Sequence, residues 1–234
     1  MNKQAPQARG RVHPAWGMLA LVLLGLLTAQ GTRIAFGAFV PAWRDGLHAG
    51  LGTISLIGMV SYLFYGLTQP LVGTLTGRFG PRAVLSAGVF IAGAGLLLAS
   101  ASTSVPALLV LYGVVTTLGF SAASGVTAGL VVRQWFIARR GLAVGLVESG
   151  FGAGQFVFTP LSLFLIDVYG WRTTLVVEGV LLVAFVGPVT ALLLRSTPSD
   201  AGHEPYGGPD TEDVQQQQKS SKGQMGAVLR SRLL

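Results

Sequence analysis

Long apolar stretches separated by short polar segments fill the first 195 residues of the chain. Runs without Lys, Arg, Asp or Glu extend over residues 12–32, 46–77 and 83–132. A bilayer core about 30 Å thick is crossed by roughly 20 apolar residues in a helix, so each run holds at least one span. The longest run holds two, with a natural break at the Ser-Thr-Ser-Val-Pro segment 102–106. Two further apolar runs flank residues 167–172.

This pattern predicts an all-α integral membrane protein with six transmembrane helices, over residues 15–40, 51–75, 83–101, 106–132, 141–166 and 172–194. Residues 1–14 form an N-terminal tail outside this bundle, which we place at 15–194. Residues 195–234 contain Pro, Gly, Ser, Asp and four consecutive Gln, a composition that cannot bury a core. We expect this second tail to be disordered.

The composition fits a membrane protein and excludes several other classes. Only 11% of the residues are charged, whereas a soluble domain carries about 25%. There is no cysteine, and His13, His48 and His203 lie at span ends or in the tail, so no metal site is predicted. The chain also lacks an ATP-binding glycine-rich motif and a catalytic triad pattern. We therefore predict no enzyme activity and no cofactor.

Positive charge is concentrated in three polar segments and indicates topology. The net charge is +7. Because positively charged connections stay in the cytoplasm, both termini are predicted to be cytoplasmic. We expect a bacterial inner membrane and, in the absence of a nucleic-acid-binding motif, no nucleic-acid partner. The basic residues of the N-terminal tail and of the second and fourth connections are Lys3, Arg9, Arg11, Arg78, Arg82, Arg133, Arg139 and Arg140.

The Ser-Gly-Phe-Gly-Ala-Gly segment 149–154 looks at first like a phosphate-binding loop. The dinucleotide fingerprint G-x-G-x-x-G needs a third glycine where this chain has Gln155, and it needs a preceding strand. Within a membrane helix, glycines four residues apart instead allow close approach of helix backbones. The pairs predicted to pack in this way are Gly141 with Gly145 and Gly150 with Gly154.

Two connections share a pattern 90 residues apart. Phe-Gly-Pro-Arg at 79–82 enters the third helix, and Tyr-Gly-Trp-Arg at 169–172 enters the sixth. The charge pattern places residues 79–82 on the cytoplasmic side of the membrane and residues 169–172 on the outer side. A three-helix unit repeated in opposite orientation is typical of secondary transporters, so a 3+3 inverted repeat is predicted. The alternative is that Gly and Arg are simply common at helix ends.

Two motifs resemble those of a known family. Residues 73–82, Gly-Thr-Leu-Thr-Gly-Arg-Phe-Gly-Pro-Arg, resemble the G-x-L-x-D-R-x-G-x-R loop of the major facilitator superfamily, with Gly77 in place of the acidic residue. Residues 135–154, together with Pro160, are similar to the branch of monocarboxylate and oxalate/formate transporters. The resemblance covers about residues 14–195. It implies the amino-terminal half of a twelve-helix carrier that moves small mono- or dicarboxylates by alternating access.

Three charged residues lie inside the predicted spans, where a charge costs roughly 2.5–3.5 kcal/mol and needs a cavity or a partner. Arg33 would bind a substrate carboxylate through two hydrogen bonds, pair with Glu178, or reach the outer interface. Glu148 shares a helical face with Gln155 and would either couple transport to protons or contact basic residues at a cytoplasmic gate. The gating candidates are Glu148, Arg78, Arg82, Arg139 and Arg140.

Polar side chains on the first, second, fourth and fifth predicted helices complete the candidate site. We expect substrate contacts from Gln30, Tyr65, Gln155, Thr117 and Ser121, in addition to Arg33. For the polar stripes of the second and fourth helices, hydrogen bonding between helices is the alternative role. Such helices would form one polar side of the bundle.

The predicted partners are the lipid bilayer, a small carboxylate, and either a missing C-terminal half or a second copy of the chain. An apolar restart at residues 227–234 resembles the approach to a seventh helix. The alternative function is therefore a truncated membrane fragment that does not transport, or a half-transporter that acts only as an oligomer.

Overall fold

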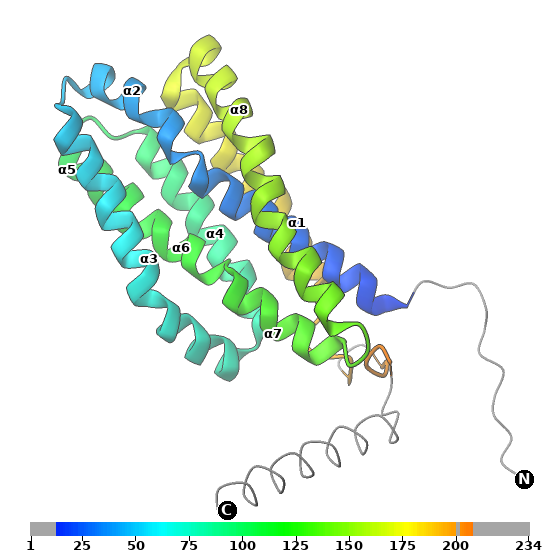
Figure 1. Ribbon diagram of the computed structural model, residues 1–234. Helices are drawn as coiled ribbons and strands as arrows, with labels where there is room; N and C mark the ends of the chain where they lie inside the picture. The colour runs from blue at the N-terminus through cyan, green and yellow to red at the C-terminus, as the bar shows by residue number, and fades with distance from the viewer. Residues whose placement is uncertain (1–12, 200–201, 208–234) are drawn as a thin grey trace, which may run out of the picture.

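The computed structural model describes residues 13–199 and 202–207, and helices account for nearly all of them (Figure 1). The helices pack side by side into one elongated bundle. They are α1 (Pro14–Ile34), α2 (Phe36–Leu47), α3 (Leu51–Phe79), α4 (Pro81–Ser100), α5 (Val105–Leu108), the π-helix η1 (Leu109–Thr116), α6 (Thr117–Ala122), α7 (Gly125–Trp135), α8 (Arg140–Val180), the π-helix η2 (Leu181–Val186) and α9 (Gly187–Leu193).

These elements correspond to the six predicted helices. Five stretches are long and apolar enough to cross a membrane, and the longest, Arg140–Leu193, contains two helices. Gly170 separates them with φ 80° and ψ 161°, a conformation that only glycine adopts readily. The first predicted helix continues through α2 to Leu47, beyond its predicted end at residue 40. Pro41 lies inside α2, is exposed, and does not end the helix.

Glycine pairs bring the helices into close contact. A Cβ on Gly31 of α1 would lie 2.8 Å from the carbonyl oxygen of Gly154 in α8. A Cβ on either Gly93 or Gly179 would lie 2.9 Å from the carbonyl oxygen of the other, where α4 crosses the end of α8. Only glycine permits backbones to approach this closely, so these crossings are fixed by the sequence.

The predicted glycine surface of α8 is divided between two faces. Gly150 and Gly154 are buried against α1, and a Cβ on Gly150 would lie 2.6 Å from Leu23 Cδ1. Gly141 and Gly145 are exposed and have no neighbouring atom within 4 Å of an added Cβ. The expected packing of this second pair is absent from the described chain, because the buried stripe of α8 runs along the opposite face.

The two similar connections make reciprocal contacts between the third and sixth helices. Arg82, at the start of α4, donates from Nε and Nη2 to the carbonyl oxygen of Ala191 near the end of α9, at 2.9 and 2.6 Å. Arg172, at the start of the sixth helix, donates to the carbonyl oxygen of Ser102 just beyond the end of α4, at 2.9 Å. Each arginine therefore satisfies a carbonyl at the C-terminal end of the other helix.

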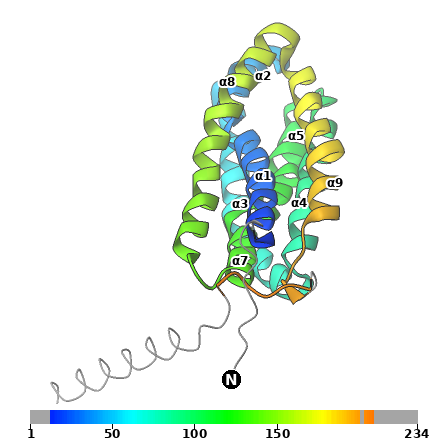
Figure 2. The ribbon, with the colours of Figure 1, turned by 90° about the vertical axis from the view of Figure 1, so that its right-hand side faces the viewer.

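Part of the segment predicted to be disordered is docked beneath the bundle (Figure 2). The Tyr206 amide donates to the carbonyl oxygen of Trp135 at 2.8 Å, and its own carbonyl accepts from Ile137 and Ala138. Its ring packs edge-on against Trp16, with centroids 5.7 Å apart. Residues 195–199 and 202–207 thus have a defined place, whereas residues 1–12, 200–201 and 208–234 lie outside the described structure. The average composition of the tail concealed this aromatic anchor.

Candidate functional site

The fourth helix is broken between α6 and α7, and polar side chains of the bundle gather around this break. The α6 helix ends at Ala122, Ala123 has φ −88° and ψ 54°, and Ser124 is extended before α7 begins. Carbonyl groups near such a break lose their intrahelical partners. Gln30 of α1 supplies replacements, because its Nε2 donates to the carbonyl oxygens of Phe120 and Ala123 at 2.9 and 2.8 Å.

Arg33 lies one turn beyond Gln30 and is partly exposed. Its Nε donates to Gln30 Oε1 at 2.8 Å, and its Cζ lies 4.2 Å from the Tyr65 ring centroid and 5.3 Å from that of Tyr62. Within the described residues its terminal nitrogens have no hydrogen-bond acceptor. A guanidinium held at Nε and stacked on an aromatic face keeps its two-nitrogen edge for a planar anion such as a carboxylate.

The predicted contacts Thr117 and Ser121 are fully buried and are engaged with α3. Thr117 shares a hydrogen bond of 2.7 Å with Ser61, and Ser121 accepts one of the same length from Thr68. Gln69 extends this network, because its Oε1 accepts from Ser124 Oγ at 3.2 Å. These side chains connect the second and fourth helices, which is the alternative role expected for them.

Glu148 and Gln155 occupy an exposed face of α8. Glu148 Oε1 is 3.6 Å from the position of a Cβ on Gly125, the first residue of α7, so the carboxylate lies near a helix N-terminus. Arg140 donates instead to the carbonyl oxygen of Arg133 at 2.9 Å. In the described part of the chain, the expected gate contact between Glu148 and these arginines is not formed.

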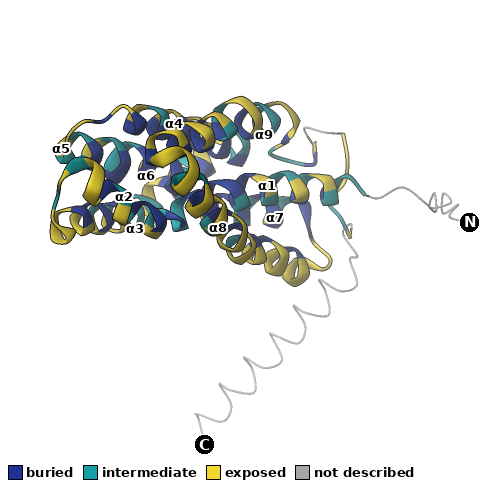
Figure 3. Ribbon diagram, turned by 90° about the horizontal axis from the view of Figure 1, so that it is seen from above, coloured by how far each residue is buried: buried dark blue, intermediate teal, exposed yellow. Residues whose placement is uncertain are grey.

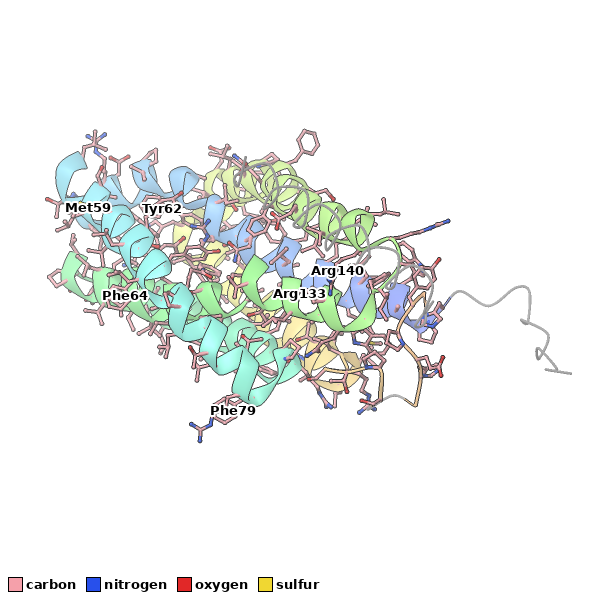
Figure 4. The ribbon with its side chains drawn as sticks, turned by 60° about the horizontal axis from the view of Figure 1, so that its bottom comes forward. Met59, Tyr62, Phe64, Phe79, Arg133 and Arg140 are labelled. Atoms are coloured by element: carbon pink, nitrogen blue, oxygen red, sulfur yellow. The ribbon has the colours of Figure 1, made fainter. Side chains whose placement is uncertain are left out.

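The remaining basic candidates lie at one end of the bundle. Arg133 lies in the last turn of α7 and Arg140 is the first residue of α8, and Phe79 marks the end of α3 (Figure 4). Arg78 is exposed beside the Phe79 ring, and Arg139 is exposed with a left-handed φ of 55° at the start of α8. Arg82 joins the third and sixth helices through the carbonyl oxygen of Ala191.

Glu178 is sealed within the bundle and does not pair with Arg33. It is 1% exposed, and its Oε1 accepts from Ser162 Oγ at 2.6 Å. Its other oxygen, Oε2, has no hydrogen-bond partner in the described structure. The sequence could not distinguish this arrangement from an ion pair, because helix rise alone placed Arg33 and Glu178 at similar depth.

Sequence reasoning missed three residues around the site: Tyr62, Thr68 and Ser162. Tyr62 precedes Tyr65 by three residues, so the two rings share a helical face, and this spacing was a usable signal. The helix break had a signal too, in the small residues Ser121 to Gly125. No metal-binding cluster is found among the described residues.

Exposed residues line much of α3 and α8 (Figure 3), and many of these residues are large and apolar. Large exposed side chains on these helices include Met59, Leu67, Leu71, Phe156 and Phe164. A lipid environment or another apolar partner is needed to cover them. A bundle of membrane-crossing helices that encloses charged and polar side chains is an integral membrane protein with a candidate functional site inside the bundle.

Comparison with known proteins identifies the family. The sequence profile of the Major Facilitator Superfamily matches residues 21–234, and the chain belongs to this superfamily. It is a transporter-family membrane protein and not an enzyme. Mouse monocarboxylate transporter 9 is 30% identical over 169 residues, which are 71% of this chain and 33% of the relative.

Two other relatives give the same picture. The oxalate:formate antiporter of Oxalobacter formigenes is 29% identical over 194 residues, or 79% of this chain and 45% of the relative. Monocarboxylate transporter 13 of Rattus norvegicus is 28% identical over 196 residues, or 83% of this chain and 45% of the relative. The chain thus spans about a third to a half of the length of these curated relatives.

Proposed function

We propose that the chain forms one half of a secondary transporter for small organic anions, mono- or dicarboxylates, and that Arg33 binds the carboxylate. The observation that carries this proposal is the guanidinium of Arg33, partly exposed, held at Nε by Gln30 and stacked on Tyr65. A cation in a membrane span without an acidic partner needs an anion to balance it. The names of the relatives support a carboxylate.

The reciprocal contacts of Arg82 and Arg172 support an inverted repeat of three helices. Residues 90 positions apart enter the third and sixth helices after glycines with nearly equal conformations, φ 82° at Gly80 and φ 80° at Gly170. Two units related by a pseudo-two-fold axis are expected to make such paired contacts. The cytoplasmic location of both termini, in a bacterial inner membrane, belongs to the same proposal.

Alternating access requires a second bundle against which this one rocks. Glu148 and Gln155 lie on an exposed face of α8, and Gly154 of the same helix contacts Gly31, two residues before Arg33. An exposed face so close to Arg33 supports docking of such a partner there. The partner is either the remainder of a longer protein or a second copy of the chain. Glu148 and the exposed arginines Arg78, Arg139 and Arg140 are proposed to act at the gate.

Carboxylate binding to the purified chain in lipid nanodiscs tests this proposal. We expect oxalate or formate to bind wild type and to bind Arg33→Met much more weakly, with equal thermal stability of the two proteins. Arg172→Met is the matched control, because that arginine contacts a helix-end carbonyl outside the site. Equal carboxylate affinity of wild type and Arg33→Met would remove Arg33 from the site.

The second candidate function is a membrane component that transports only as an oligomer or not at all. The matched part covers 33–45% of the length of these relatives, which corresponds to one bundle, whereas alternating access needs two. Mass measurement of the purified chain in nanodiscs, followed by carboxylate uptake into proteoliposomes, decides between the candidates. Uptake by a dimer supports the half-transporter, and a monomer without uptake supports the fragment.

A further inference from the structure

Gln30 has no hydrogen-bond donor left to recognise a carboxylate. It is completely buried, and both hydrogens of its amide are donated to carbonyl oxygens of the fourth helix. Its Oε1 accepts from Arg33 Nε at 2.8 Å. The predicted role as a substrate contact therefore does not fit its surroundings. Its hydrogen bonds instead link the break in the fourth helix to the guanidinium of Arg33.

The carbonyls that Gln30 binds are those left open by the break. In a continuous helix the Phe120 carbonyl would accept from the amide of residue 124, and the Ala123 carbonyl from that of residue 127. The extended conformation of Ser124 ends this ladder, and the next intrahelical bond runs from the Ala128 amide to the Ser124 carbonyl. The positions of the two open carbonyls, and hence of the Gln30 amide, depend on the angle between α6 and α7.

We propose that Gln30 is a positioning residue that couples the bend of the fourth helix to the orientation of the Arg33 guanidinium. This inference rests on the proposed function, in which Arg33 binds the carboxylate. A change in the bend moves the acceptor oxygen that holds Arg33 Nε. Coupling between two equilibria is reciprocal, so anion binding at Arg33 also shifts the bend.

The same bend reaches the second helix. Ser124 at the break donates to Gln69, and Ser121 just before it accepts from Thr68. Tyr65, on which the guanidinium stacks, lies one turn before these two residues on α3. A change at the break therefore alters both surfaces that orient Arg33, its hydrogen-bond acceptor and its aromatic platform.

The first test compares Gln30→Met with Gln134→Met in nanodiscs. Methionine keeps the length of the side chain and removes its hydrogen bonds, and Gln134 lies near the end of α7 outside this network. We expect oxalate to bind Gln30→Met about tenfold more weakly than wild type or worse, the usual effect of losing a hydrogen bond to a charged group. Gln134→Met should bind oxalate like wild type.

The second test measures the bend directly. Because the chain has no cysteine, spin labels can be attached at Val110→Cys and Val126→Cys, exposed positions on either side of the break. We expect oxalate to shift the distance between the labels in the wild-type background. The shift should be lost with Gln30→Met at saturating oxalate, and Arg33→Met should lose both binding and shift. A merely structural role of Gln30 would lower thermal stability without changing this response.

The outcomes separate the two proposals. Absence of oxalate and formate binding to the wild-type chain overturns the proposed function. Binding that depends on Arg33, with an unchanged label distance or with wild-type affinity of Gln30→Met, overturns the role of Gln30 alone. Should Gln30→Met fail to fold, a label distance that does not respond to saturating oxalate in the wild-type background still overturns the coupling.

Discussion

Arg33 and Glu178 are charged residues within membrane-crossing helices, and the fold accommodates them in opposite ways. Arg33 remains partly exposed, and its partners are an amide oxygen and aromatic faces. Glu178 is 1% exposed and has a single hydrogen bond, from Ser162. Both residues avoid the direct ion pair that would have neutralised them together.

The difference separates a ligand site from a structural site. The partners of Arg33 fix its orientation without cancelling its charge, so its attraction for an anion is preserved. Glu178 directly precedes Gly179, which packs closely against Gly93, and it is 1% exposed, so a ligand does not reach it. A charged residue in a membrane helix is thus a good candidate for ligand binding when it is accessible. When it is fully buried, a structural role is the better interpretation.

The largest expected effect comes from reversing the buried charge. Glu178→Lys places a longer cation in a closed layer without an acidic partner, and we expect a loss of stability on the order of 3–5 kcal/mol. Glu148→Lys is the matched control, since the same substitution at an exposed site near the N-terminus of α7 should change stability by only about 1 kcal/mol or less. Thermal unfolding in detergent would measure both. Similar melting temperatures for the two variants would show that Glu178 is not enclosed.

Replacement of Arg33 by Lys should affect ligand binding and leave stability largely intact. Lysine keeps the charge but loses the planar pair of donors and the stacking on Tyr65, so carboxylate affinity should fall about tenfold, equivalent to roughly 1.4 kcal/mol. Calorimetric titration with oxalate would measure this change. If Arg33→Lys binds as tightly as wild type, charge alone recruits the anion and the two-nitrogen geometry has no role.

The order of the helices could be predicted from the sequence because the membrane imposes it. Apolar runs of sufficient length between basic connections indicated six helices, and Gly80 and Gly170 marked two of the turns. The helix ends were less predictable. Pro41 lies within a helix that continues to Leu47, and no local signal shows that its outer part stays helical.

The candidate site was only partly predictable, because hydrogen-bond partners depend on distances between helices. The sequence identified Arg33, Gln30 and Tyr65, which the structure brings together. It did not reveal that the amide of Gln30 is fully used by the break in the fourth helix. Periodicity shows which residues share a face, but it does not show which neighbouring backbone groups that face meets.

Removal of the single partner of Glu178 should have an intermediate effect. Ser162→Ala leaves a buried carboxyl group without any hydrogen bond, and such a group costs about 1–3 kcal/mol. Ser149→Ala is the control, because Ser149 is an exposed serine on the same helix that bonds to its own backbone. We expect Ser162→Ala to lower the melting temperature clearly and to leave oxalate affinity unchanged. A loss of oxalate affinity would instead show that Ser162 and Glu178 influence the ligand site.

The smallest effect is expected for Glu178→Gln, which keeps the shape of the side chain and an acceptor for Ser162. One carboxyl oxygen already lacks a partner, so the amide group gives up no hydrogen bond and removes an ionisable group from the interior. We expect a change of about 1 kcal/mol or less in the free energy of unfolding, together with wild-type oxalate affinity. Arg33→Met should show the opposite pattern, with affinity lost and stability kept. If Glu178→Gln and Arg33→Met both lost oxalate affinity, both charges would serve one site. The contrast between an accessible cation and an enclosed carboxyl group would then no longer hold.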